Sequence, residues 1–139
     1  ATGRMAALTA SLALLALARH GESAAPLRIR EISEAHEIPE RYLVQILLQL
    51  KAAGLVASTR GALGGYRLAK PATEIAISEV LTAIDGPDHS HGGSKNDKGW
   101  ASRTLATVWE RVRRAELEVL DRTTIAELVD QSAPREWTI

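Results

Sequence analysis

The stretch STRGALGGYRLAK, residues 58–70, constrains the fold of this chain more than any other feature. It lies between LVAST and GYRLA, in which apolar and polar residues alternate as they do in paired strands. Glycine weakens the interior of helices and strands, so Gly61, Gly64 and Gly65 mark a turn. The alternating flanks predict that this turn is the tip of a β-hairpin.

Helical patterns precede the hairpin. Apolar residues recur at helical spacing over residues 5–19, over residues 29–36 and again from Pro39 to Gly54. Two short helices joined by a tight turn and followed by a hairpin form the winged helix–turn–helix layout. The stretch over residues 5–19 also has the charge and apolar character of a secretory signal. Its closely spaced leucines favour a buried core helix, and the apolar run is too short to span a bilayer.

Composition narrows the function classes. A length of 139 residues suits one domain with an appended arm. The formal net charge is zero, so any binding to nucleic acid must come from a local patch. The absence of cysteine excludes disulfides, thiolate metal sites and thiol catalysis. Because no catalytic constellation or membrane span is visible, we expect a cytoplasmic protein that is not an enzyme and has no membrane partner.

The residue pattern of the second half of the chain predicts a loop followed by a long helix. Residues 87–101 are polar, glycine-rich and without periodicity, which is typical of a surface loop. An apolar stripe then follows at helical spacing: Leu105, Val108, Trp109, Val112, Ala115, Val119 and Leu120. Packing against the same helix of a second chain would bury this stripe, and packing back on its own domain is the alternative. We therefore divide the chain into a winged-helix domain (1–86), a sensor-type loop (87–101) and a dimerisation helix with a short closing helix (102–139).

The helix that follows Pro39 is the candidate recognition helix, because the early residues of such a helix read base edges in the major groove. Arg41 could bind phosphate or guanine, Gln45 adenine, and Glu40 cytosine. A merely solvated polar face is the alternative. The predicted DNA-contacting residues are Arg28, Pro39, Glu40, Arg41, Tyr42, Gln45, Thr59, Arg60, Gly61, Gly64, Gly65, Tyr66 and Arg67, with Lys70 as a further phosphate donor.

Three motifs occur in order: PERYLVQIL, GLVASTRGALGGYRLAK and EIAISEV. Together they resemble the winged helix–turn–helix regulators typified by IscR and NsrR, the Rrf-two family. The resemblance covers residues 12–87 and extends to the later dimerisation helix. It implies a mainly α fold with a small β-hairpin, and a homodimeric transcription regulator that binds pseudo-palindromic double-stranded DNA. We expect this regulator to act as a repressor. A clusterless winged-helix dimer that binds other proteins, or senses another signal, is the alternative.

The chain departs from that family in its loop. Many members hold an iron–sulfur cluster through three cysteines there, whereas this chain has Ser90, Ser94 and Ser102. Serine hydroxyls do not hold iron as thiolates do, so we expect no cofactor in this chain. It is either a naturally clusterless member or a form in which serines replace the cysteines of a cluster-bearing parent, and only the latter implies redox, iron or nitric oxide sensing. His89 and His91 are weak metal-ligand candidates, with polar filler as the alternative.

Overall fold

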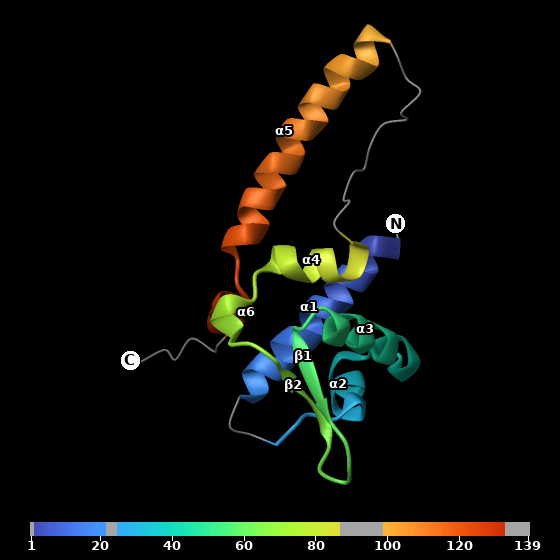
Figure 1. The fold of residues 1–139 in the computed structure, drawn as a ribbon, viewed down its shortest axis with the longest axis vertical. Helices are drawn as coiled ribbons and strands as arrows, with labels where there is room; N and C mark the ends of the chain where they lie inside the picture. The colour runs from blue at the N-terminus through green and yellow to red at the C-terminus, as the bar shows by residue number, and fades with distance from the viewer. Residues whose placement is uncertain (1, 22–24, 87–98, 133–139) are drawn as a thin grey trace, which may run out of the picture.

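The computed structural model describes residues 2–21, 25–86 and 99–132. It is mainly helical with a two-stranded antiparallel hairpin, as the sequence predicts. In Figure 1 the hairpin lies at one end of the molecule and the long helix α5 extends from the other. The elements are α1 (Thr2–His20), α2 (Ile29–His36), α3 (Glu40–Ala52), β1 (Val56–Thr59), β2 (Gly65–Leu68), the 3₁₀ turn η1 (Ala72–Glu74), α4 (Ile77–Asp85), α5 (Trp100–Arg122) and α6 (Ile125–Ser132).

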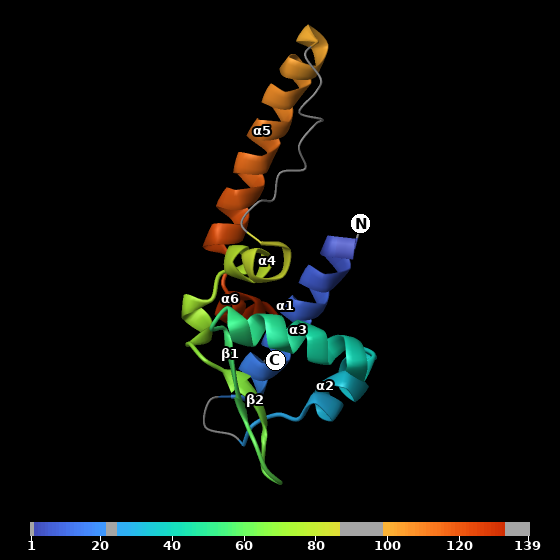
Figure 2. The ribbon, with the colours of Figure 1, turned by 45° about the vertical axis from the view of Figure 1, so that its right-hand side comes forward.

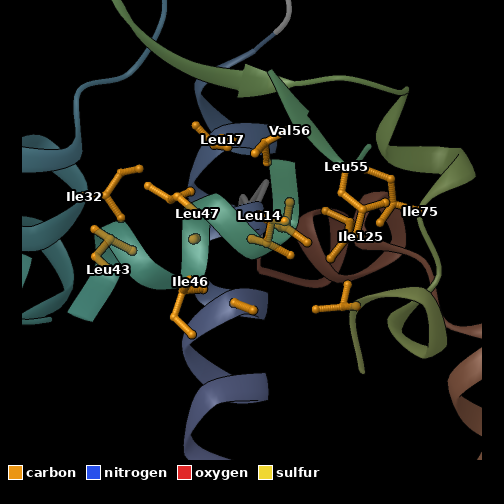
Figure 3. Packing of buried hydrophobic residues seen from close by; sticks show 14 of the residues in the cluster. Leu14, Leu17, Ile32, Leu43, Ile46, Leu47, Leu55, Val56, Ile75 and Ile125 are labelled. Carbon is orange, nitrogen blue, oxygen red and sulfur yellow. The ribbon is translucent and has the colours of Figure 1, made fainter. Parts of the chain in front are cut away.

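Helix α1 runs through the centre of an aliphatic core. Its residues Leu14 and Leu17 pack with residues from α2, α3 and β1 (Figure 3). Ala10, Ala13 and Leu14 of α1 are fully buried, so the prediction that the first helical stretch is a core helix is confirmed. None of the helices among the described residues combines the length and apolar character needed to cross a bilayer.

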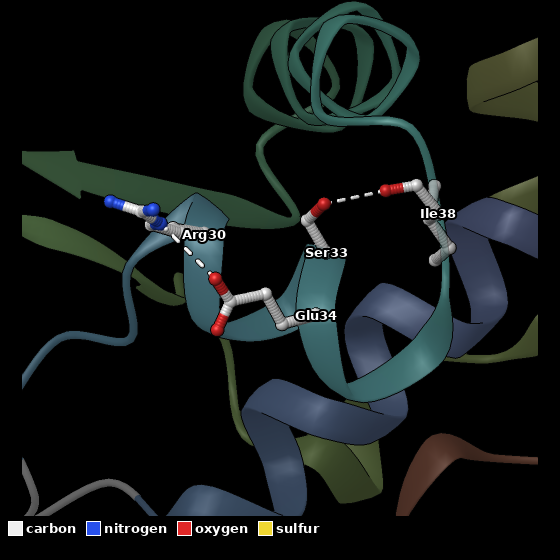
Figure 4. Close-up of polar contacts among 4 residues, drawn as sticks. All are labelled: Arg30, Ser33, Glu34 and Ile38. Carbon is white, nitrogen blue, oxygen red and sulfur yellow. Dashed lines mark hydrogen bonds and ion pairs between the residues drawn. The ribbon is translucent and has the colours of Figure 1, made fainter.

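The turn between α2 and α3 sets the direction of α3 relative to α2. Glu37 ends α2 in the left-handed conformation with φ of 52°. The Ser33 hydroxyl donates to the Ile38 carbonyl oxygen at 2.6 Å, and the Ile38 amide donates to the Ser33 carbonyl oxygen at 3.1 Å (Figure 4). Pro39 then precedes the first turn of α3, where its missing N–H is harmless. The tight helix–turn–helix predicted from the sequence is therefore held by local hydrogen bonds.

The C-terminal helix α6 returns to the core after α5. Extended residues beside α4 and α6 pair in antiparallel fashion, with the Ile77 amide donating to Thr123 and the Ile125 amide donating to Ile75, each at 2.9 Å. The Ile125 side chain is fully buried, and α6 packs on α1. Sequence reasoning grouped this helix with the dimerisation helix, whereas its contacts are with the winged-helix core.

The starts of α4 and α6 are determined by different contacts. Helix α4 begins at Ile77, shortly after η1. The pairing of the preceding segment with residues 123–125 decides this boundary, because it holds Ala76 in extended conformation. At α6, the Glu127 amide donates to the Thr124 hydroxyl at 3.2 Å, as capping-box spacing predicts.

Candidate nucleic-acid interface

The wing is an antiparallel hairpin in which Val56 pairs with Leu68 and Thr59 pairs with Gly65. The segment before α2 adds a third line of backbone to it. The Leu27 amide donates to the Tyr66 carbonyl oxygen at 2.9 Å, and the Tyr66 amide donates to the Leu27 carbonyl oxygen at 2.7 Å. This pairing fixes the wing relative to the helix–turn–helix.

The three wing positions are occupied by glycine for different structural reasons. A Cβ at Gly64 would lie 2.3 Å from the Thr59 carbonyl oxygen, and one at Gly65 would lie 2.6 Å from the Leu27 carbonyl oxygen. Both glycines therefore let the chain pass close to its own backbone. Gly61 has φ of +106° and open space around it. Of the three, Gly61 alone combines exposure with room for an approaching groove.

Gly65→Ala is expected to detach the wing from the segment before α2. The added methyl group meets the Leu27 backbone, and φ of +155° is itself unfavourable for alanine, so the variant should lose about 2 kcal/mol of local stability. Hydrogen exchange of the Leu27 and Tyr66 amides measures this. Gly61→Ala has a positive φ but no steric contact, so it should leave both amides protected. Equal protection in Gly65→Ala would contradict the assignment.

Several cations near the wing already have partners within the chain. The Arg28 guanidinium donates to the Ala62 carbonyl oxygen at the wing tip, so this residue links the start of α2 to the tip. The Lys70 ammonium lies 2.8 Å from the Glu79 carboxylate, and Arg30 pairs with Glu34 on α2 (Figure 4). The two carboxylates partly neutralise Lys70 and Arg30, and the Arg28 guanidinium is already hydrogen-bonded. The positive charge of these side chains is therefore only partly available to an anion outside the protein.

Arg41 and Arg60 differ from these cations. Both are exposed, and neither has a hydrogen-bond or ion-pair partner among the residues that the structure describes. Arg41 lies in the first turn of α3, with Gln45 one turn later on the same exposed side. Arg60 follows β1 directly at the wing. Figure 2 shows α2, α3 and the wing together on the part of the molecule remote from the far end of α5.

The other residues predicted to contact DNA differ in their exposure to solvent. Pro39, Glu40, Tyr42, Thr59 and Arg67 are exposed. Gly64 is buried, and Gly65 and Tyr66 are half-buried, with the Tyr66 side chain packed against the core. These positions support the wing from within, and their contact with DNA stays a prediction.

Sequence reasoning passed over two exposed apolar residues at this end of the molecule. Leu48 on α3 is 53% exposed, and Leu63 at the wing tip is 82% exposed. Leu48 had a detectable signal, because it is out of phase with the buried positions of its own helix: Leu43, Ile46, Leu47 and Leu50. Leu63 had none beyond its place among the glycines.

At the other end, α5 exposes the apolar stripe that the sequence predicts. Leu105, Val108, Trp109, Val112 and Val119 are all exposed, with Trp109 at 66%. Leu120, the last residue of the predicted stripe, is half-buried. The half-buried Leu117 and the exposed Asp121 line a groove with residues of α4 and with Ala53 and Leu55, which precede β1. Most of the stripe therefore does not pack back on its own domain, and its packing against a second chain stays a prediction.

The candidate former cluster positions and the two histidine candidates for metal binding lie mostly outside the described residues. Ser90, Ser94, His89 and His91 fall in residues 87–98, and only Ser102, half-buried in the first turn of α5, is described. Within the described ranges, no three histidine, aspartate or glutamate side chains gather in a way that could hold a metal ion. The whole sequence has no cysteine, so its donor set does not fit an iron–sulfur cluster.

A helix–turn–helix whose second helix, α3, presents polar side chains outward, followed by a wing with a glycine-rich tip, defines a winged-helix DNA-binding protein. The sequence matches the Rrf2 family, described as "Iron-dependent Transcriptional regulator", over residues 6–131. The chain belongs to this family of transcriptional regulators.

Individual relatives agree with this membership. An HTH-type transcriptional regulator of Mycobacterium tuberculosis is 39% identical over 107 residues, and the match spans 75% of this chain but 66% of that protein's length. IscR of Serratia proteamaculans is 38% identical over 120 residues, which cover 85% of this chain and 73% of that protein. The crystal structure of Staphylococcus aureus CymR has a TM-score of 0.75 at 31% identity, covering 91% of this chain and 96% of that chain.

Proposed function

We propose that this protein is a homodimeric, cytoplasmic transcription repressor that binds pseudo-palindromic DNA through two copies of α3 and two wings. The observation that carries the proposal is the pair of exposed guanidinium groups of Arg41 and Arg60, which have no partner among the residues that the structure describes. An exposed arginine of this kind is available to a phosphate or to a guanine edge. By contrast, Arg28 and Lys70 are engaged within the chain by Ala62 and Glu79.

The exposed stripe on α5 supports the dimer. A helix of 23 residues that leaves its domain cannot bury five large apolar side chains alone. The same helix of a second copy offers a matching stripe under two-fold symmetry. That symmetry would place the two α3 helices on half-sites separated by about one turn of DNA, or about 34 Å, or a multiple of it.

We propose further that regulation in this chain does not use an iron–sulfur cluster. Ser90, Ser94 and Ser102 offer hydroxyl groups where a cluster needs soft thiolates. Residues 87–98 join α4 to α5, so a signal bound there would act on the orientation of α5 and hence on the spacing of the two α3 helices. Mass spectrometry of the purified protein, together with its absorption spectrum, tests for a bound metal.

A mobility-shift titration in rising salt tests DNA binding. Genomic fragments are first selected with the purified protein to obtain an operator. Arg60→Ala and Arg41→Ala should each weaken operator binding by about tenfold and reduce its salt dependence, because each removes a contact to phosphate or base. Arg114→Ala on the polar side of α5 is the matched control and should bind as wild type.

Two outcomes would overturn this function. Failure of the wild-type protein to retain any genomic fragment at low salt would favour the protein-interaction alternative. Binding whose strength does not change with salt or with loss of either arginine would remove the interface from α3 and the wing. Transcription from a promoter that overlaps the selected operator separates repression from activation.

A further inference from the structure

The exposed large apolar side chains of the described residues lie along α5, at the start of α1, on α3 and at the wing tip. Met5 and Leu8 belong to α1, Tyr42 and Leu48 to α3, and Leu63 to the wing tip. A single exposed leucine needs no explanation, but exposed apolar residues on the helix that faces DNA in the proposed function indicate a contact surface.

Leu48 lies on the outward face of α3. It is three residues after Gln45 and seven after Arg41, so the three side chains follow one side of the helix. The buried face of the same helix is formed by other residues, including Leu43 and Leu47. Leu48 therefore extends the row of side chains that faces DNA in the proposed function, and it adds an apolar group to a polar row.

We infer that Leu48 contacts the 5-methyl group of a thymine in the major groove. This inference rests on the proposed function. The thymine methyl is the one apolar group that the base pairs present in that groove. Leu48 lies about 4.5 Å further along the helix than Gln45, close to one base step of about 3.4 Å. A cytosine at the same place would present an amino group that leucine cannot hydrogen-bond, so the contact selects thymine.

Substitution of deoxyuridine for single thymines in the selected operator tests this contact, because it removes only the methyl group. Wild-type protein should lose about fourfold in affinity at one thymine of each half-site, as expected for one apolar carbon. Leu48→Ala should bind the thymine and deoxyuridine operators equally at that position. Leu48→Met keeps an apolar side chain and should keep the sensitivity.

Leu63→Ala is the matched control, since it removes an exposed leucine of the wing and should leave the thymine sensitivity intact. Alanine is the best helix former, so Leu48→Ala should unfold at the wild-type temperature. The inference is overturned if wild-type affinity is indifferent to every thymine methyl, or if Leu48→Ala keeps the wild-type sensitivity. In both cases the protein still binds its operator, whereas failure of the proposed function is recognised by the absence of operator binding.

Discussion

Trp109→Glu is expected to convert the proposed homodimer into monomers. Trp109 is exposed near the middle of the α5 stripe, and two-fold symmetry would place it in the proposed interface twice. Loss of a central aromatic contact costs about 2 kcal/mol or more per side, so the dissociation constant should rise by about 10³-fold. The buried carboxylates would add to this loss. Sedimentation velocity across a range of protein concentrations measures the change.

A charge on the opposite face of the same helix is the control for this variant. Thr107→Glu adds the same carboxylate two residues away, among the exposed polar residues Arg103, Glu110 and Arg114, and should remain dimeric. The Trp109→Glu monomer should bind a single half-site but lose the additional affinity for the full operator. A Trp109→Glu protein that sediments as a dimer would show that the stripe on α5 is not the interface.

Ile125→Ala is expected to destabilise the whole winged-helix domain. Ile125 is fully buried, and its amide is bonded to Ile75 at 2.9 Å, so the side chain sits where α6 closes the core. Truncation leaves a cavity that costs about 3 kcal/mol in the free energy of unfolding. Chemical denaturation measures this at one fixed protein concentration, because dimerisation contributes to apparent stability.

Leu63→Ala removes an exposed aliphatic side chain and should change the same free energy by less than about 0.5 kcal/mol. If Ile125→Ala lowered the free energy of unfolding by no more than this control, α6 would belong with the dimerisation helix and not with the core. The comparison therefore decides to which unit the C-terminal helix belongs in solution.

The candidate site could be predicted from the sequence wherever its signal is local. The outward polar residues of α3, Arg41 and Gln45, follow from the helical period once the buried leucines are identified. The hairpin follows from alternation on both sides of the glycines. Which cations remain available could not be predicted, because Arg28 and Lys70 find their partners at Ala62 and Glu79 through tertiary contacts.

By itself, the sequence determined which segments are α-helices and which form the hairpin, and it located the apolar stripe of α5, because periodicity depends on near neighbours along the chain. The boundaries of α2 at Ile29 and His36 agree with the pattern for this reason. The pattern did not predict η1. Only the tertiary structure decided why Gly64 and Gly65 must lack side chains, and that α6 completes the core. These features depend on backbone contacts between residues far apart in sequence, such as Leu27 with Gly65 and Ile75 with Ile125. No local pattern encodes such distances, because they are set by how the packed elements meet.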